Sequence, residues 1–184
     1  MRQLVLLALA LASTTVFAAR TEKDTLVNTR YVSSEADLAG FQESVLELPD
    51  FPNEKSKWFD IYVSSDFKMQ PQLLLDSVQI APDQTVRYVL NMKSPKGFDN
   101  LSAEGIHCTD AMFSSKSSTF KVFAFGDTVN QRWISTRKAE WRPIGAILNT
   151  DNKVHGVLYR TFCEDGLPRN AEEMSARIKV RAGR

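Results

Sequence analysis

Cysteine, histidine and glycine are all scarce in this chain. Its 184 residues include two cysteines, two histidines and eight glycines. A metal site needs several ligands that converge, and His107 and His155 stand far apart with no Cys-x-x-Cys or His-x-His pair near them. The glycines form no phosphate-binding loop, and no Gly-x-Ser-x-Gly nucleophile motif occurs. We therefore expect no metal and no cofactor, and the sequence favours a non-enzymatic protein.

Long apolar runs are also missing, with one exception at the N-terminus. Residues 4–12 are apolar, and Arg2 precedes them. Val16 and Ala18 place small residues at positions −3 and −1 before a cleavage site after Ala18. The run of about nine residues is well short of the roughly 20 that span a bilayer. This pattern is typical of a secretory signal peptide. We predict that residues 1–18 are cleaved off near Ala18, that the mature chain begins at Ala19 and that no transmembrane segment follows.

The shortage of cysteine limits what can happen after export. No cysteine precedes Cys108, so the signal lacks the residue to which bacterial lipid is attached, and we predict no lipid anchor. Cys108 and Cys163 are an even pair in a chain bound for an oxidising compartment, and we predict that they form one disulfide. The alternative is two free thiols, one of which acts as a nucleophile.

Neither sign of charge dominates the mature chain. Removal of residues 1–18 leaves 166 residues with 22 Lys and Arg against 22 Asp and Glu, so no net charge directs the protein toward nucleic acid. The length fits one domain. Residues 19–33 are polar and lack apolar periodicity, which predicts a flexible N-terminal arm before a single domain at residues 34–184.

Two amphipathic helices are predicted, one near each end of the domain. The first starts at a Ser34 cap, ends before Pro49 and carries one apolar stripe, formed by Leu38, Phe41, Val45 and Leu48. The second starts at Asn170, which Glu173 follows at capping-box spacing. Met174 and Ile178 lie one turn apart on its apolar side.

Between these helices the apolar spacing changes to two, which is typical of β-strands. The predicted strands are residues 58–63, 73–80, 85–92, 101–108 and 120–125. The loop 81–84 joins the second and third of them as a hairpin. The connections are too short for helical crossovers, so we expect antiparallel pairing.

The last part of the chain is less regular. Residues 126–153 are predicted as short strands with turns, and the apolar stretch 155–163 fits either a strand or a helix. Together the patterns predict an α+β domain in which an antiparallel β-sheet is flanked by an N-terminal and a C-terminal helix and is linked by one disulfide.

One segment combines basic and aromatic residues. Its members are Arg132, Trp133, Arg137, Lys138, Trp141 and Arg142, with Glu140 as the one acidic residue among them. Cations interleaved with aromatic rings bind anionic polymers by charge and stacking, so this segment is the candidate binding surface. The alternative is that both tryptophans belong to the core and the charges form a solvated rim.

A cluster for acid and base catalysis is harder to assemble. Glu104, His107 and Asp110 lie close in sequence and are the candidates for a hydrolase. Glu104 and His107 are three positions apart, so on a strand their side chains point to opposite faces.

Several short motifs occur in a characteristic order. They are 48–52 (Leu-Pro-Asp-Phe-Pro), 86–88 (Val-Arg-Tyr), 97–100, 104–108 (Glu-Gly-Ile-His-Cys), Trp133, Trp141 and 162–163 (Phe-Cys). Taken together they resemble the CNP1-like family of small exported proteins from Gram-negative bacteria, over residues from about 40 to 180. The resemblance implies a periplasmic location and supplies no catalytic residues.

The leading hypothesis is therefore a periplasmic, non-enzymatic protein that binds or supports an anionic envelope component or an envelope protein. One alternative is a periplasmic hydrolase that uses carboxylates and His107. Another is a small-ligand carrier, which would need an apolar cavity.

Overall fold

The structure is a computed structural model that describes residues 41–108, 118–144 and 152–184. All of these residues belong to one unit, Val32–Arg184. The predicted signal peptide and N-terminal arm, together with Asp110, lie outside the described residues.

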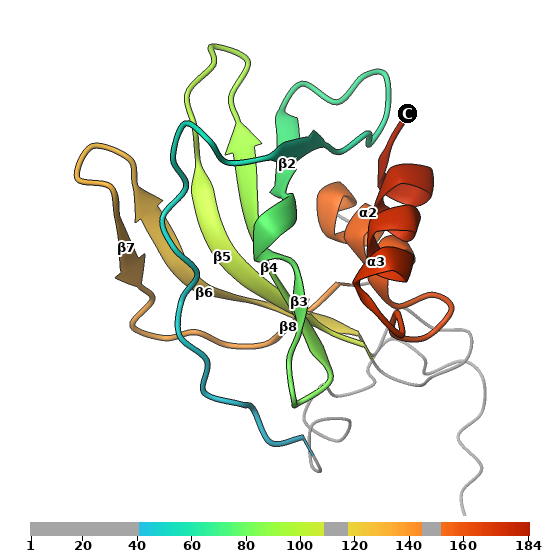
Figure 1. The fold of residues 1–184 in the computed structure, drawn as a ribbon. Helices are drawn as coiled ribbons and strands as arrows, with labels where there is room; N and C mark the ends of the chain where they lie inside the picture. The colour runs from blue at the N-terminus through green and yellow to red at the C-terminus, as the bar shows by residue number, and fades with distance from the viewer. Residues whose placement is uncertain (1–40, 109–117, 145–151) are drawn as a thin grey trace, which may run out of the picture. The chain divides into compact units, whose positions relative to one another are not determined.

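Within the described residues, eight strands form one antiparallel sheet (Figure 1). They are β1 (Trp58–Asp60), β2 (Gln70–Leu74), β3 (Gln79–Ile80), β4 (Thr85–Lys93), β5 (Leu101–His107), β6 (Thr119–Asp127), β7 (Arg132–Ser135) and β8 (Arg142–Pro143). The main path across the sheet is β1-β2-β4-β5-β6-β7, while β3 pairs with β4 and β8 pairs with β6. The predicted antiparallel pairing is confirmed.

Two helices cover one face of this sheet (Figure 1). Helix α2 (Lys153–Phe162) shows that the ambiguous apolar stretch 155–163 is mainly helical. Helix α3 (Ala171–Arg177) runs on into the π-helical turn η2 (Ile178–Ala182). The predicted cap is confirmed, because the Asn170 side chain accepts a hydrogen bond of 2.8 Å from the Glu173 N–H.

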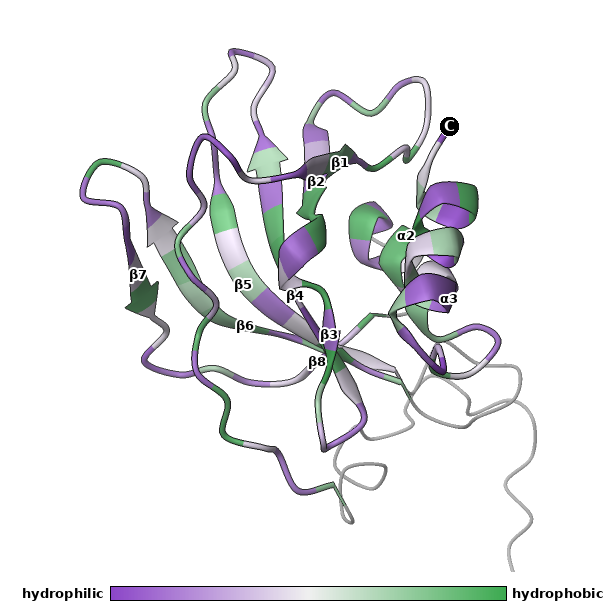
Figure 2. Ribbon diagram, viewed as in Figure 1, coloured by the Kyte–Doolittle hydropathy of each residue, from purple (hydrophilic) through white to green (hydrophobic). Residues whose placement is uncertain are grey.

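The hydrophobic core lies between the sheet and these helices, where green residues of both layers meet in Figure 2. Alternate residues of β4 point into it, and Val86, Tyr88 and Leu90 are almost completely buried. From the helices the core receives a set of buried apolar side chains: Val154, Val157, Leu158, Phe162, Met174 and Ile178. A 3-10 turn, η1 (Leu75–Ser77), connects β2 to β3, and its Leu75 packs against this core.

The predicted N-terminal helix is not supported by the structure. Residues 34–40 of it lie outside the described residues, and residues 41–48 carry no helical hydrogen bonds. Val45, which the prediction placed on the apolar stripe, is 99% exposed. Residues 41–53, here named the strap, instead cross the sheet face opposite the helices (Figure 1). Partners far along the chain hold the strap extended, and such partners leave no local signal in the sequence.

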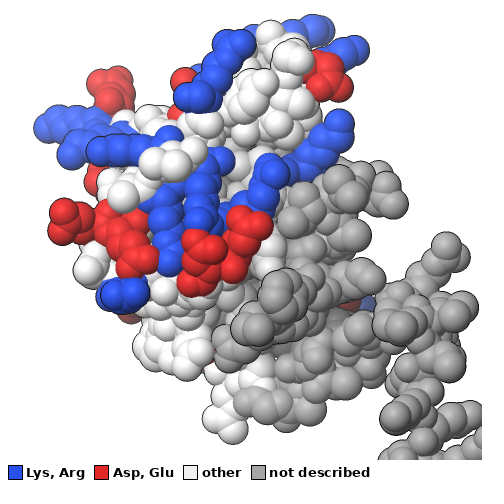
Figure 3. Space-filling view, turned by 90° about the vertical axis from the view of Figure 1, so that its right-hand side faces the viewer, with Lys and Arg blue, Asp and Glu red and all other residues white. Residues whose placement is uncertain are grey.

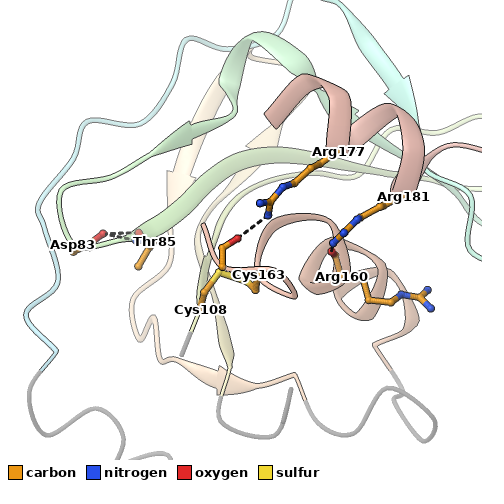
Figure 4. Close-up of a disulfide and its surroundings, with 8 residues drawn as sticks. Asp83, Thr85, Cys108, Arg160, Cys163, Arg177 and Arg181 are labelled. Carbon is orange, nitrogen blue, oxygen red and sulfur yellow. Dashed lines mark hydrogen bonds between the residues drawn. A yellow bond between two sulfur atoms is a disulfide. The ribbon is translucent and has the colours of Figure 1, made fainter. Parts of the chain in front are cut away.

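The predicted disulfide is present and joins the two layers. Cys108 follows β5, Cys163 follows α2, and their Cα atoms are 5.3 Å apart (Figure 4). The alternative of two free thiols is therefore wrong. Nearby, the Arg177 Nη1 group donates to the carbonyl of Gly166 at 2.6 Å, and the Arg181 Nη1 group donates to the carbonyl of Arg160 at 2.8 Å.

Candidate functional site

The predicted basic and aromatic segment runs along the outer edge of β6. Arg132 pairs with Asp127 at one end of that strand, and Arg142 pairs with Phe120 near the other end. The segment from β7 to β8 therefore lies beside nearly the whole strand. At about 3.3 Å per residue, its two ends are roughly 23 Å apart.

The two tryptophans of this segment point toward the strap. The Trp133 Nε1–H donates to the carbonyl oxygen of Pro49 at 2.7 Å, and the Trp133 ring lies 5.1 Å from the ring of Phe51. The Trp141 Nε1–H donates to Glu43 Oε2, also at 2.7 Å. Both tryptophans are half-buried. They hold the strap on the sheet. This position differs from both sequence-based alternatives, which were the hydrophobic core and an exposed binding surface.

The four cations of the segment are exposed. The Arg132 side chain is 68% exposed and lies 3.4 Å from Asp127. Arg137, Lys138 and Arg142 are exposed and form no ion pair with any other described residue. The segment thus places its aromatic side chains inward and its cations outward.

The helix layer carries cations as well, but acidic residues pair with several of them. Arg177 lies 2.5 Å from Glu173, and Arg181 contacts both Asp165 and Glu164. Figure 3 shows blue and red side chains intermixed on this side of the molecule. The helix layer is therefore a weaker candidate for an anion-binding surface than the β6 edge.

A buried arginine occupies the strap side of the sheet. The Arg87 Nε–H donates to Thr85 Oγ1 at 2.7 Å, its Nη2 group donates to Asp83 at 2.8 Å, and its guanidinium lies 4.1 Å from the centre of the Phe123 ring. Gly105, on the strand between them, leaves room for this side chain, since a Cβ there would lie 2.9 Å from Arg87 Cδ.

The carboxylate of Asp83 joins this arginine to the strap. Burial works against its ionisation, but hydrogen bonds from the Thr85 hydroxyl and from the N–H groups of Ser44 and Thr85, with the charge of Arg87, outweigh burial. The pKa of Asp83 is consequently lower than usual. The Asp83 carboxylate remains charged and holds the strap at Ser44.

A second buried carboxylate, Glu104, lies on the opposite side of the sheet, facing α2. Its side chain is 5% exposed and contacts the Tyr88 hydroxyl at 3.1 Å, the Ser102 hydroxyl at 2.6 Å and His155 Nε2 at 2.9 Å. Burial would raise its pKa, but the hydrogen bond and charge of His155 and the hydroxyl groups of Ser102 and Tyr88 lower it overall.

This cluster differs from the one considered in the sequence. Glu104 faces α2 while His107 packs against Phe41 of the strap, with ring centres 4.2 Å apart, so the two do not converge. The imidazole that Glu104 meets belongs to His155, 51 positions away. A buried carboxylate on a strand needs a polar partner, but no residue near Glu104 in the sequence identified that partner.

The Glu104–His155 pair has the residue types and the 2.9 Å separation of an acid–base dyad, but both side chains are largely buried. The His155 side chain is 12% exposed, and its ring stacks on Phe120 at 3.9 Å. The contact links the sheet to α2. Across the described ranges no three metal-ligating residues gather, and no described helix is long and apolar enough to cross a membrane.

Comparison with known proteins agrees with the resemblance noted in the sequence. The CNP1-like family matches residues 36–179. The chain belongs to this family. It is also 47% identical to Cryptic neisserial protein 1 of Neisseria gonorrhoeae (strain ATCC 700825 / FA 1090), over 193 aligned positions that cover all of this chain and 95% of that protein. No solved structure matches this chain.

The structure brings together several of the sequence motifs on which the resemblance to the CNP1-like family rests. The motif at residues 48–52 is part of the strap, and Trp133 holds its Pro49. Arg87 and Gly105 lie next to each other on the sheet face beneath it. Motifs that are far apart in the sequence of this CNP1-like chain thus form one face of the fold.

Proposed function

We propose that this protein is exported to the periplasm and binds an anionic component of the cell envelope without catalysing a reaction. The observation that carries the proposal is the two-sided segment along β6. Trp133 and Trp141 fix it to the strap, so that the cations between and beside them project from a braced edge of the sheet. Cations on a backbone that is already held in place bind an anion at a smaller cost in conformational entropy than cations on a flexible segment do.

The spacing of the cations favours a partner with repeated negative charges. Arg132 and Arg142 mark the two ends of a stripe that is roughly 23 Å long at strand spacing, with Arg137 and Lys138 between them. A single small anion would contact one of these residues. A layer of anionic lipid headgroups or lipopolysaccharide would contact several at once.

The location is supported by the signal-peptide pattern of residues 1–18 and by the Cys108–Cys163 disulfide, which suits an oxidising compartment. Release of the periplasm by osmotic shock should free the protein, and its mass should correspond to a chain that begins at Ala19 and carries no lipid. Retention of the protein in the cytoplasmic fraction would contradict this location.

Binding is tested with charge variants. The edge variant is Arg132→Gln, Arg137→Gln, Lys138→Gln and Arg142→Gln combined. The matched control removes the same charge elsewhere on the exposed surface, by Lys55→Gln, Lys57→Gln, Lys68→Gln and Lys96→Gln. Co-sedimentation is measured with lipopolysaccharide and with vesicles that contain or lack an anionic phospholipid.

We expect the edge variant to bind roughly tenfold more weakly than the control variant, because each exposed ion contact is worth about 0.2–1 kcal/mol. Added salt should weaken binding of the unmodified protein. Equal binding by the edge variant and the unmodified protein would refute the proposed surface. Equal losses in the two variants would show that net charge, rather than this edge, governs binding.

A further inference from the structure

A cavity of about 210 Å³ lies between the strap and the sheet. Its apolar lining includes Leu48 of the strap, Ala103 of β5 and Phe123 of β6. An apolar cavity of roughly 150 Å³ is sufficient for benzene, so this one has room for a small molecule with one short apolar group.

Among the charged residues that border the cavity, Arg87 and Glu47 have capacity for a further contact. Arg87, whose side chain is 9% exposed, uses its Nε–H and one Nη2–H for Thr85 and Asp83, and its Nη1 group has no acceptor among the described residues. On the strap, Glu47 has neither a hydrogen bond nor an ion pair within the described part of the chain. The Nη1 group is not fully buried, so it can donate to a ligand that enters the cavity.

The other charged groups near the cavity are already occupied. Glu43 accepts two hydrogen bonds from Lys121, at 2.9 and 2.7 Å, and a third from Trp141. Glu104 contacts Tyr88, Ser102 and His155, and Asp83 beside the cavity accepts from Ser44, Thr85 and Arg87. The charged groups left to recognise a ligand are therefore one guanidinium and one carboxylate, which lie beside an apolar wall.

We infer that this cavity binds a small zwitterion with an apolar side chain, the chemistry of an aliphatic α-amino acid such as leucine. The ligand carboxylate would accept hydrogen bonds from Arg87, its ammonium group would pair with Glu47, and its side chain would pack against Leu48 and Phe123. This site uses none of the four cations of the β6 edge and does not depend on the proposed binding to the envelope.

Three probes of similar shape separate the parts of this inference. They are L-leucine, 4-methylpentanoate, which lacks the ammonium group, and 3-methylbutylamine, which lacks the carboxylate. Binding to the full exported chain with its disulfide intact is measured by isothermal titration and by ligand-observed NMR. We expect a dissociation constant of about 1 mM or lower for leucine, since ligands of this size are limited in affinity. Each single-charge analogue should bind at least about tenfold more weakly.

Glu47→Gln is the principal variant, because Glu47 is exposed and its replacement leaves the fold intact. Leucine should bind this variant about tenfold more weakly, whereas 4-methylpentanoate should bind it as well as before or better. Glu54→Gln is the matched control, because Glu54 is exposed and directly follows the strap in the sequence. It should not change the binding of any probe. Arg87→Lys, checked by thermal melting for an intact fold, should weaken leucine and 4-methylpentanoate together.

Two outcomes would overturn the inference. One is the absence of leucine binding at millimolar concentration to the unmodified protein. The other is equal binding of leucine and 4-methylpentanoate, since the ammonium group would then have no partner in the cavity.

Discussion

Glu104 Oε2 and His155 Nε2 lie 2.9 Å apart and join β5 to α2 across the core. The same carboxylate accepts hydrogen bonds from Tyr88 and Ser102, so three side chains depend on it. Their burial makes the cluster costly to disrupt, because each group that loses its partner has no water to replace it.

Glu104→Gln should therefore destabilise the protein by about 1–3 kcal/mol, since the new amide presents a donor where the carboxylate accepted hydrogen bonds. Urea unfolding followed by circular dichroism measures the change. The exposed Glu140→Gln is the control and should alter the free energy of unfolding by less than about 0.5 kcal/mol. Similar stability of the two variants would show that the cluster does not fasten the layers.

Acid should destabilise the protein through Glu104 and Asp83, whose pKa values are both lowered in the folded state. A lowered pKa means that the folded state favours the ionised form. The stabilisation is complete above the unfolded pKa values of about 4 and is lost as the pH falls through the lower folded values. Urea midpoints measured from pH 6 to pH 3 should fall steeply at the acid end. Glu104→Gln should show a shallower fall, and an unchanged slope would contradict the assignment.

The position of Gly105 can be tested through Arg87. A Cβ at residue 105 would lie 2.9 Å from Arg87 Cδ and 3.1 Å from Phe123 Cε2, so Gly105→Ala should cost about 1–3 kcal/mol. The same substitution in an Arg87→Ala background should cost less, because one of the two close contacts is gone. A double-mutant cycle that gives no coupling between the two positions would exclude this explanation.

The attachment of the strap depends on Trp133. Trp133→Phe removes the donor to the Pro49 carbonyl and should cost about 0.5–1.5 kcal/mol. The strap should also become more sensitive to limited proteolysis between residues 41 and 53. Trp58→Phe is the control, because the Trp58 side chain makes no hydrogen bond to the strap within the described residues. Equal protease sensitivity in the two variants would count against Trp133 as an anchor.

The disulfide should contribute measurably to stability. It closes a loop between residues 55 positions apart, for which chain entropy gives a contribution of about 4 kcal/mol as an upper value. The double variant Cys108→Ser and Cys163→Ser should therefore melt at a lower temperature, and a reductant should lower the melting temperature of the unmodified protein but not of the variant. A reductant effect on the variant would point to another cause.

The sequence predicted the parts of the fold that depend on near neighbours. Alternation in β4 placed Val86, Tyr88 and Leu90 in the core, and the spacing of Asn170 and Glu173 located the start of α3. The two cysteines were predictable as a pair because the chain contains no others and its N-terminal pattern predicts export.

The strap and the Glu104 cluster could not be predicted in the same way. Phe41 and Val45 have helical spacing, yet Phe41 packs on His107 and Val45 faces solvent, because Trp141 and Trp133 set the path of the strap. Such partners are identified only once the sheet is assembled. The same applies to His155, whose position near Glu104 follows from how α2 crosses the sheet.

The strap also determines the order in which the fold can be completed. The hydrogen bonds of the strap to Trp133 and Trp141 span 84 and 98 residues. They cannot form until most of the chain has been synthesised and is free to fold. Contacts of such long sequence separation slow folding. The first described part of the chain to emerge thus waits for Trp133 and Trp141 before it can settle on the sheet, and until then the strap side of the sheet stays open to chaperones and proteases.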